Sequence, residues 1–189
     1  AVLEQIDQCQ TMIFDKTGTL TYGKPTLTEQ TIYHGMDSKE ILKLVASTER
    51  YSRHPLASAI LEAAKEEKID LIDAEQVSEK KGEGLKANVR GIDLTITSRM
   101  LLALSAEKDQ GIILPEGAGL ECLILINGRL AAHYRFRDTP RAESKSFIRH
   151  LSTKHGMKKV MIVSGDREEE VKYLADLVGI TEVFAGKSP

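Results

Sequence analysis

An aspartate follows a short apolar run near the start of the chain, in the sequence TMIFDKTGTLTYGKP that begins at Thr11. The run Thr11 to Phe14 is typical of a buried parallel strand, and such strands carry functional side chains at their carboxyl ends. A carboxylate there can attack phosphorus and form an acyl phosphate. Because attack on a nucleotide γ-phosphate brings anionic groups together, the site also needs cations and N–H donors. Asp15 is therefore the candidate nucleophile.

The residues that follow Asp15 supply the groups that this chemistry needs. Lys16 provides a positive charge, and Gly18 lets the backbone turn tightly so that amides can face phosphoryl oxygens. Thr17 and Thr19 offer hydroxyl groups. The carbonyl oxygen of Thr17 could join Asp15 in holding Mg²⁺, which prefers oxygen ligands. These residues predict a magnesium-assisted phosphoryl transfer.

The segment DKTGTLT, Asp15 to Thr21, resembles the phosphorylation motif of the P-type ATPases, which are membrane ion pumps. From the residues alone, a charged surface turn is the alternative. The resemblance implies the α/β, Rossmann-like fold of the haloacid dehalogenase superfamily. Phosphatases of that superfamily carry a second aspartate, an acid and base, where this chain has Thr17. Without that group, we expect the intermediate to persist long enough to drive a conformational step.

The segment DTPR, which begins at Asp138, resembles the hinge motif of the same family, Asp-Pro-Pro-Arg in many members. The resemblance implies that the chain returns here from an insert to the phosphorylation domain, with Asp138 and Arg141 near the nucleotide. Read in isolation, the segment also fits a helix cap at Thr139 and a first helical residue at Pro140.

An apolar run from Lys159 to Val163 predicts a second strand, and Ser164, Gly165 and Asp166 follow it. This turn resembles the Thr-Gly-Asp loop of the family, with the serine keeping the hydroxyl group. The resemblance implies that Asp166 orients Lys16 and that Gly165 approaches the phosphoryl group. We expect the carboxyl ends of both strands at the same edge of one parallel sheet.

The stretch between these motifs carries a second group of candidate residues. The pair His54 and Pro55 in RHPLASAI resembles the His-Pro motif of the heavy-metal-transporting P-type ATPases, in which the histidine orients adenine. The same subfamily carries an acidic residue five positions earlier, here Glu49. Gly82 and Gly84 match its Gly-x-Gly loop, where a nucleotide can lie against the backbone. The resemblance implies an ATP site in the insert.

Two positions depart from the pattern of the family. Many relatives carry a glutamate directly before the histidine, where this chain has Arg53. A Gly-Asn pair is expected where this chain has Thr97 and Ser98, so the contact of that asparagine with the nucleotide is absent. We expect altered contacts with ATP rather than a different fold.

The insert reads as an α+β domain with an antiparallel sheet. Residues 23–35 predict an exit linker that can include a short strand. Asp37, with Glu40 three residues later, predicts a helix start, and Pro55 predicts another. Ser98 predicts the cap of a short helix that ends near Lys108. The strands expected by sequence are Leu85 to Val89, Ile92 to Thr97, and two that flank the hairpin turn Asn127-Gly128, namely Glu121 to Ile126 and Arg129 to Phe136.

The last third of the chain alternates strand and helix, which implies a parallel sheet. A helix is expected from Glu168 to Val178 and a last strand from Glu182 to Phe184. We therefore predict a phosphorylation domain of residues 1–24 and 134–189, split by a nucleotide-binding domain of residues 25–133. The family continues beyond Pro189 with a lysine and a Gly-Asp-Gly-x-Asn-Asp segment, so we expect the phosphorylation domain to be incomplete.

Composition narrows the class of protein. The net charge of the 189 residues is −2, aromatic residues make up 5% and tryptophan is absent, which argues against nucleic acid as a partner. Cys9 and Cys122 lie far apart outside any CxxC spacing, as reduced cytosolic thiols do. No apolar run reaches the roughly 18 residues of a membrane span, so the chain alone is expected to be soluble.

The resemblance implies the ATP-binding and autophosphorylation region of a heavy-metal pump, at the cytoplasmic face of a cell membrane. It implies ATP and Mg²⁺ as cofactors. The membrane and actuator domains of the parent pump would be partners, and the transported ion would bind outside this chain. Copper, zinc, cadmium, cobalt and lead all remain open. The alternatives are a soluble haloacid-dehalogenase phosphatase and a non-catalytic nucleotide-binding module.

Overall fold

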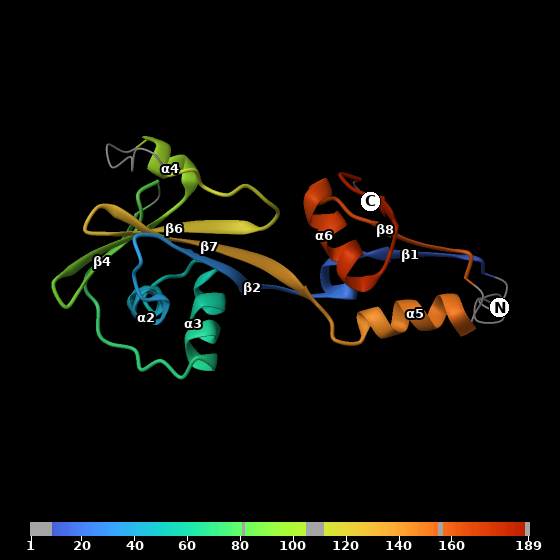
Figure 1. The fold of residues 1–189 in the computed structure, drawn as a ribbon, viewed down its shortest axis with the longest axis horizontal. Helices are drawn as coiled ribbons and strands as arrows, with labels where there is room; N and C mark the ends of the chain where they lie inside the picture. The colour runs from blue at the N-terminus through green and yellow to red at the C-terminus, as the bar shows by residue number, and fades with distance from the viewer. Residues whose placement is uncertain (1–8, 81, 105–111, 155–156, 188–189) are drawn as a thin grey trace. The chain divides into compact units, whose positions relative to one another are not determined.

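The computed structural model describes residues 9–80, 82–104, 112–154 and 157–187, which belong to two compact units (Figure 1). The first unit comprises Ala1–Lys24 and Asp138–Pro189, and the second comprises Pro25–Arg137. The chain therefore re-enters the first unit at residue 138, whereas the sequence places that crossing after residue 133. Two long strands, β2 (Thr21–Ile32) and β7 (Arg129–Pro140), carry the chain across the division.

A three-stranded parallel sheet forms the centre of the first unit. Its order is β1 (Thr11–Asp15), β8 (Lys159–Val163) and β9 (Glu182–Phe184). Two helices pack against it, α5 (Ser144–Lys154) and α6 (Glu168–Val178). The buried core includes Ile162 of β8 and apolar residues of both helices, Ile148, Leu151, Val171, Leu174, Ala175 and Val178. This core holds the carboxyl ends of β1 and β8 at one edge of the sheet.

A six-stranded sheet forms the second unit, in the order β2-β7-β6-β5-β4-β3. The pairs from β3 to β7 are antiparallel. Its strands are β2 (Thr21–Ile32), β3 (Glu75–Lys80), β4 (Gly84–Val89), β5 (Ile92–Thr97), β6 (Leu120–Ile126) and β7 (Arg129–Pro140). The predicted hairpin is confirmed: Asn127 and Gly128, both with positive φ, connect β6 to β7.

Helices α2 (Ser38–Glu49) and α3 (Ala57–Glu66) cover one face of this sheet, and the short helix α4 (Arg99–Leu104) packs on β6 (Figure 1). The Asp37 side chain accepts a hydrogen bond from the Glu40 N–H, which confirms the predicted cap of α2. Ile41, Val45 and Ile60 are buried against the sheet. The core fixes the end of α2, which carries Glu49, close to β4 and β5.

Three sequence predictions need correction. Most of the linker expected over residues 23–35 is strand β2. The helix expected at Thr139 and Pro140 begins only at Ser144, because the chain stays extended while the Arg141 N–H donates to the Leu20 carbonyl. Helix α3 begins two residues after Pro55, since a turn comes first in which the Ala57 N–H bonds to the His54 carbonyl. The end expected near Lys108 lies outside the described residues.

Among the described residues, no helix combines the length and apolar character that crossing a membrane requires.

Candidate functional site

Asp15 is the last residue of β1 and directly precedes the turn Lys16–Leu20. It lies in register with Val163, the last residue of β8, so the Ser164–Asp166 turn begins at the same sheet edge. Asp15 is exposed, whereas Lys16 is only 8% exposed. The structure thus places an accessible carboxylate beside a buried cation at the carboxyl edge of a parallel sheet, where catalytic groups commonly lie.

Lys16 is held by the turn that follows β8. Its Nζ lies 3.0 Å from Oδ2 of Asp166. The Ser164 hydroxyl donates to the same oxygen over 3.0 Å, and accepts from the Asp166 N–H over 3.2 Å. Burial alone would raise the pKa of Asp166, but the hydrogen bond and charge of Lys16 lower it overall. Asp166 therefore stays ionised and fixes the ammonium group of Lys16 next to Asp15 in the chain.

Asp138 and Arg141 bind the turn that follows Asp15. The Arg141 guanidinium donates to the Gly18 carbonyl over 3.0 Å, and Gly18 itself has φ +77°, which favours glycine. The Asp138 carboxylate contacts the Thr21 hydroxyl and accepts from the Lys24 N–H over 3.2 Å. Both residues thus hold the turn in place, while their contact with a nucleotide stays a prediction.

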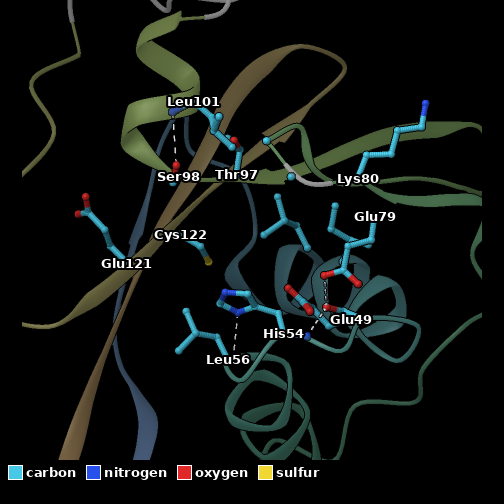
Figure 2. Close-up of a pocket in the computed structure, with 15 residues that line it drawn as sticks. Glu49, His54, Leu56, Glu79, Lys80, Thr97, Ser98, Leu101, Glu121 and Cys122 are labelled. Atoms are coloured by element: carbon cyan, nitrogen blue, oxygen red, sulfur yellow. Dashed lines mark hydrogen bonds between the residues drawn. The ribbon is translucent and has the colours of Figure 1, made fainter.

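A cavity of about 300 Å³ lies in the second unit (Figure 2). Glu49, His54, Gly82 and Gly84, which the sequence proposes for the nucleotide, all line it. Its volume is at the lower end of the range for small-molecule pockets. The remaining lining residues are Ser52, Leu56, Glu79, Lys80, Leu85, Ile96, Thr97, Ser98, Leu101, Glu121 and Cys122. Residues that are far apart in the sequence therefore meet in one binding-sized cavity.

The His54 ring is fixed in one tautomer by the backbone. The Leu56 N–H donates to Nδ1 of His54 over 3.2 Å. Because Nδ1 accepts, the neutral ring carries its proton on Nε2, a tautomer inferred from this hydrogen bond. His54 is exposed, so Nε2–H is available to a ring nitrogen or oxygen of a ligand.

Glu49 is the last residue of α2 and is only 4% exposed. Its Oε2 is buried and has no hydrogen-bond partner within the part of the chain that the structure describes. Burial raises the pKa of Glu49 to about 7, and the charge of Glu79 adds to this rise. The negative end of the helix dipole also disfavours the ionised form. Near neutral pH the carboxyl group can therefore both donate and accept hydrogen bonds.

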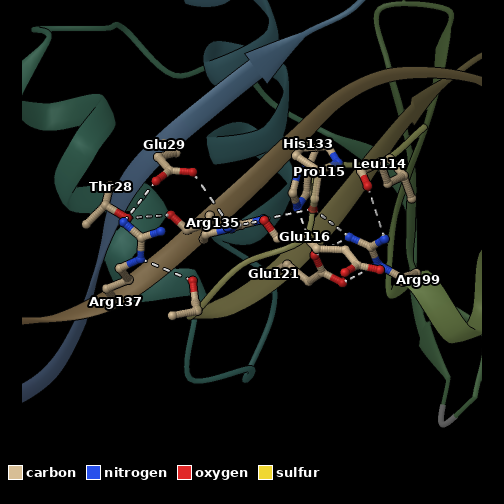
Figure 3. A network of polar contacts seen from close by, with 11 residues as sticks. Thr28, Glu29, Arg99, Leu114, Pro115, Glu116, Glu121, His133, Arg135 and Arg137 are labelled. Atoms are coloured by element: carbon tan, nitrogen blue, oxygen red, sulfur yellow. Dashed lines mark hydrogen bonds and ion pairs between the residues drawn. The ribbon is translucent and has the colours of Figure 1, made fainter. Parts of the chain in front are cut away.

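A third acidic side chain of the cavity, Glu121, is neutralised by an arginine (Figure 3). Nε of Arg99 lies 2.7 Å from Oε1 of Glu121, and its NH2 lies 2.9 Å from Oε2. This bidentate hydrogen bond lowers the pKa of Glu121, despite its partial burial. Since Glu121 is paired with Arg99 and Glu49 is only partly ionised near neutral pH, the cavity carries less negative charge than its three carboxyl groups would give if all were ionised and unpaired.

The same network ties residues 114–118 to the sheet. His133 is buried and donates from Nε2 to Glu121 over 2.9 Å, while burial lowers the pKa of His133. Arg135 donates to the carbonyls of Pro115 and Glu116. The buried side chains of His133 and Arg135 thereby have hydrogen-bond partners, as buried polar groups usually do. The network is structural, and it positions the start of β6, which forms one wall of the cavity.

A side chain at position 84 would disturb the packing of the sheet as well as the space for a ligand. Its φ is +78°, and a Cβ there would lie 2.4 Å from the Ile96 carbonyl oxygen. Gly82 has a similar φ, +83°, but open space around it. We expect Gly84→Ala to cost more stability than Gly82→Ala by about 1–3 kcal/mol, because only the former adds a backbone clash to the strain of positive φ. Urea unfolding followed by circular dichroism measures both, and equal losses would contradict the steric argument.

Ser98 and Thr97 also line the cavity, at the position where the family motif has Gly-Asn. The Ser98 hydroxyl accepts from the Leu101 N–H over 3.3 Å and caps α4, which confirms the predicted cap. The cap of α4 therefore uses one acceptor position of the Ser98 hydroxyl, which is then not available to a ligand.

Known proteins share the arrangement of a carboxylate, a cation and a serine-containing turn at one edge of a parallel sheet. Residues 9–188 match the family described as haloacid dehalogenase-like hydrolase. The chain belongs to the haloacid dehalogenase-like hydrolases. Their fold accounts for the parallel sheet of the first unit, and the predicted fold class is confirmed.

The relatives of this haloacid dehalogenase-like chain include metal-exporting P-type ATPases. It is 34% identical over 192 residues to a copper-exporting P-type ATPase of Staphylococcus haemolyticus, covering 99% of this chain and 23% of that protein. The chain therefore spans less than a third of the length of this curated relative. The resemblance to P-type ATPases drawn from the motifs is confirmed.

Similar solved structures are also those of P-type ATPases. The chain is similar to a zinc-transporting PIB-type ATPase in the E2.Pi state, with a TM-score of 0.79 and 28% identity, covering 98% of this chain and 30% of that one. It is also similar to the catalytic domain of the CPx-ATPase CopB-B, studied for conformational changes upon nucleotide binding. There the TM-score is 0.66 and the identity 29%, over 100% of this chain and 67% of that one.

Several residues of this haloacid dehalogenase-like chain were not found by sequence reasoning. Glu79 and Ser52 line the cavity, and Arg99 neutralises Glu121 within it. Ser52 lies two residues before His54, and this proximity could have indicated that it lines the same cavity. No local sequence pattern indicates the long-range contacts that bring Glu79 and Glu121 to the cavity.

Proposed function

We propose that this chain is the ATP-binding and phosphorylation part of a P-type ATPase that transports a heavy-metal ion across a membrane. The observation that carries the proposal is the position of Asp15 at the carboxyl edge of the parallel sheet, followed by Lys16 in its ion pair with Asp166. The similarity to copper-exporting and zinc-transporting P-type ATPases supports it.

In the proposed reaction, a carboxylate oxygen of Asp15 attacks the γ-phosphorus of ATP, the bond to the β–γ bridging oxygen breaks, and ADP leaves. Lys16 stabilises the negative charge on the phosphoryl oxygens, and Asp166 keeps the ammonium group in position. Ser164 and Gly165 form the turn that would face the phosphoryl group. Thr17 cannot act as the acid and base that hydrolyses an acyl phosphate, so the aspartyl phosphate lasts.

The oxygen donors at this edge fit a magnesium ion. The Asp15 carboxylate and the Thr17 carbonyl are hard oxygen ligands of the kind that Mg²⁺ prefers, and water and phosphate oxygens usually complete its shell. When bound, the ion would neutralise charge between the carboxylate and the phosphoryl oxygens.

ATP would bind in the cavity of the second unit. Glu49 and Nε2–H of His54 offer hydrogen bonds to adenine, and Gly82 and Gly84 leave room beside the backbone. The bound nucleotide supplies the γ-phosphate that Asp15 receives. Membrane and actuator domains of the parent pump, at the cytoplasmic face of the membrane, would convert the phosphorylated state into ion movement. Copper and zinc are both represented among the relatives and the similar structures.

His54→Ala is expected to weaken the binding of ATP to this chain by at least about tenfold, since it removes a hydrogen bond and a ring contact with adenine. Isothermal titration of the purified chain with ATP measures the effect. His34→Ala is the matched control, because His34 belongs to the same unit but does not line the cavity. Equal affinities of the wild type and His54→Ala would contradict the proposed nucleotide site.

A further inference from the structure

The turn that carries His54 is anchored to the sheet by one acidic side chain. Glu79 lies on β3, which is the edge strand and pairs with β4. Its Oε1 accepts from the Ser52 hydroxyl over 2.9 Å, and its Oε2 accepts from the Arg53 N–H over 3.2 Å. Figure 2 shows Glu79 reaching from its strand toward the turn beside Glu49. Both carboxylate oxygens are thus engaged by a turn that lies 26 and 27 residues away in sequence.

The contact continues from Glu79 to His54. The Ser52 hydroxyl, which donates to Glu79, also accepts from the His54 N–H over 3.0 Å. Nδ1 of His54 in turn accepts from the Leu56 N–H. The carboxylate orients the Ser52 hydroxyl, so that its lone pairs face the backbone of His54. A chain of hydrogen bonds therefore runs from the edge strand to the backbone N–H of His54, and the separate bond from Leu56 fixes the ring on that backbone.

This chain of bonds joins two walls of the cavity. The turn carries His54, whereas β3 and the segment after it carry Glu79 and Gly82. We propose that Glu79 is a positioning residue for nucleotide binding, which holds the His54 ring in register with the Gly82–Gly84 wall through Ser52 and Arg53. The inference rests on the proposed function of the cavity. It also gives Glu79 a role that does not require contact with the nucleotide.

The carboxylate of Glu79 and its position on β3 suit it to this role. A carboxylate accepts stronger hydrogen bonds than a neutral group, and each oxygen of Glu79 has one N–H or O–H donor. The residue before the histidine, Arg53, contributes only its backbone N–H to this bridge. Without Glu79, the turn between α2 and α3 would keep its local bonds but lose its side-chain link to the sheet. The His54 ring would then sample several positions, and ATP binding would be weaker because it must order the ring again.

A double-mutant cycle tests the inference with the purified chain and ATP. We expect Glu79→Ala to weaken ATP binding about tenfold in the presence of His54. In the His54→Ala background, we expect Glu79→Ala to have an effect of less than about twofold, because a residue that acts through His54 has nothing left to position. Additive losses would overturn the inference, since they indicate direct contact with ATP or general damage. Glu79→Gln keeps one acceptor oxygen and should recover part of the affinity.

A second measurement needs no nucleotide. The ¹³C relaxation of the His54 ring reports its order parameter, and we expect a high value in the wild type and a lower one in Glu79→Ala. Glu75→Ala, on the same strand but outside the cavity, should leave both the order parameter and ATP binding unchanged. An order parameter that is unchanged in Glu79→Ala would refute the positioning role. If His54→Ala itself leaves ATP binding intact, the proposed nucleotide site fails, while the order parameter still decides whether Glu79 holds the ring in place.

Discussion

Asp15→Asn is expected to abolish the hydroxylamine-sensitive radiolabel that the full-length protein takes up from ATP labelled on its γ-phosphate. An amide oxygen is a much weaker nucleophile than a carboxylate oxygen and cannot form the acyl phosphate. The substitution keeps the size of the side chain and leaves the Lys16–Asp166 ion pair in place. Acid quenching after incubation with magnesium, followed by electrophoresis at low pH, measures the label.

The variant should still bind ATP with an affinity within about twofold of the wild type, because Asp15 is outside the unit that holds the cavity. Asp176→Asn is the matched control, an exposed carboxylate on α6 of the same unit, and it should label normally. Label that survives in Asp15→Asn would mean that another residue accepts the phosphoryl group. Release of phosphate from small esters without ATP would instead favour a soluble phosphatase, which Thr17 argues against.

The placement of Asp15, Lys16 and Asp166 at one sheet edge could be predicted from the sequence because each follows directly from its own strand. Asp15 and Lys16 are adjacent, and the strand before them fixes which sheet edge they occupy. Asp166 follows its own strand in the same way, so the rule that parallel strands present site residues at their carboxyl ends brings the two together. The hairpin at Asn127-Gly128 was predictable for a similar reason, since two adjacent residues determine a tight turn.

Other features depend on pairings that no local pattern encodes. Most of β2 was expected as a linker because its Gly and Pro residues disfavour strands, yet pairing with β7 overrides that preference. Glu79 reads as one more charged residue on an edge strand, and only the folded chain brings it to Ser52. The same holds for the contact of Arg99 with Glu121, which are 22 residues apart. Tertiary contacts of this kind placed the residues that sequence reasoning missed.

The protonation of Glu49 is expected to control the affinity of the cavity for adenosine. Adenosine is the useful probe because its base and ribose do not titrate between pH 6 and 8, whereas the terminal phosphate of ATP does. A neutral carboxyl group can donate to a ring nitrogen of adenine and accept from its amino group, while an ionised carboxylate can only accept. With the pKa of Glu49 raised to about 7, the neutral fraction falls from about 0.9 at pH 6 to about 0.1 at pH 8. Affinity should therefore fall about tenfold over this range.

Glu49→Gln separates this mechanism from a contribution of any other ionisable group that lines the cavity. The amide both donates and accepts like the neutral acid, so this variant should hold adenosine at pH 8 as tightly as the wild type does at pH 6, with no dependence on pH. An adenosine affinity of Glu49→Gln that still falls with pH would assign the titration to another group.

The raised pKa of Glu49 also predicts how the stability of the fold changes with pH. Between about pH 4.5 and 7 the unfolded carboxyl group loses its proton and the folded one keeps it, so the wild type loses stability as pH rises. Glu49→Gln should lack this loss and be more stable than the wild type at pH 8, by up to about 3 kcal/mol.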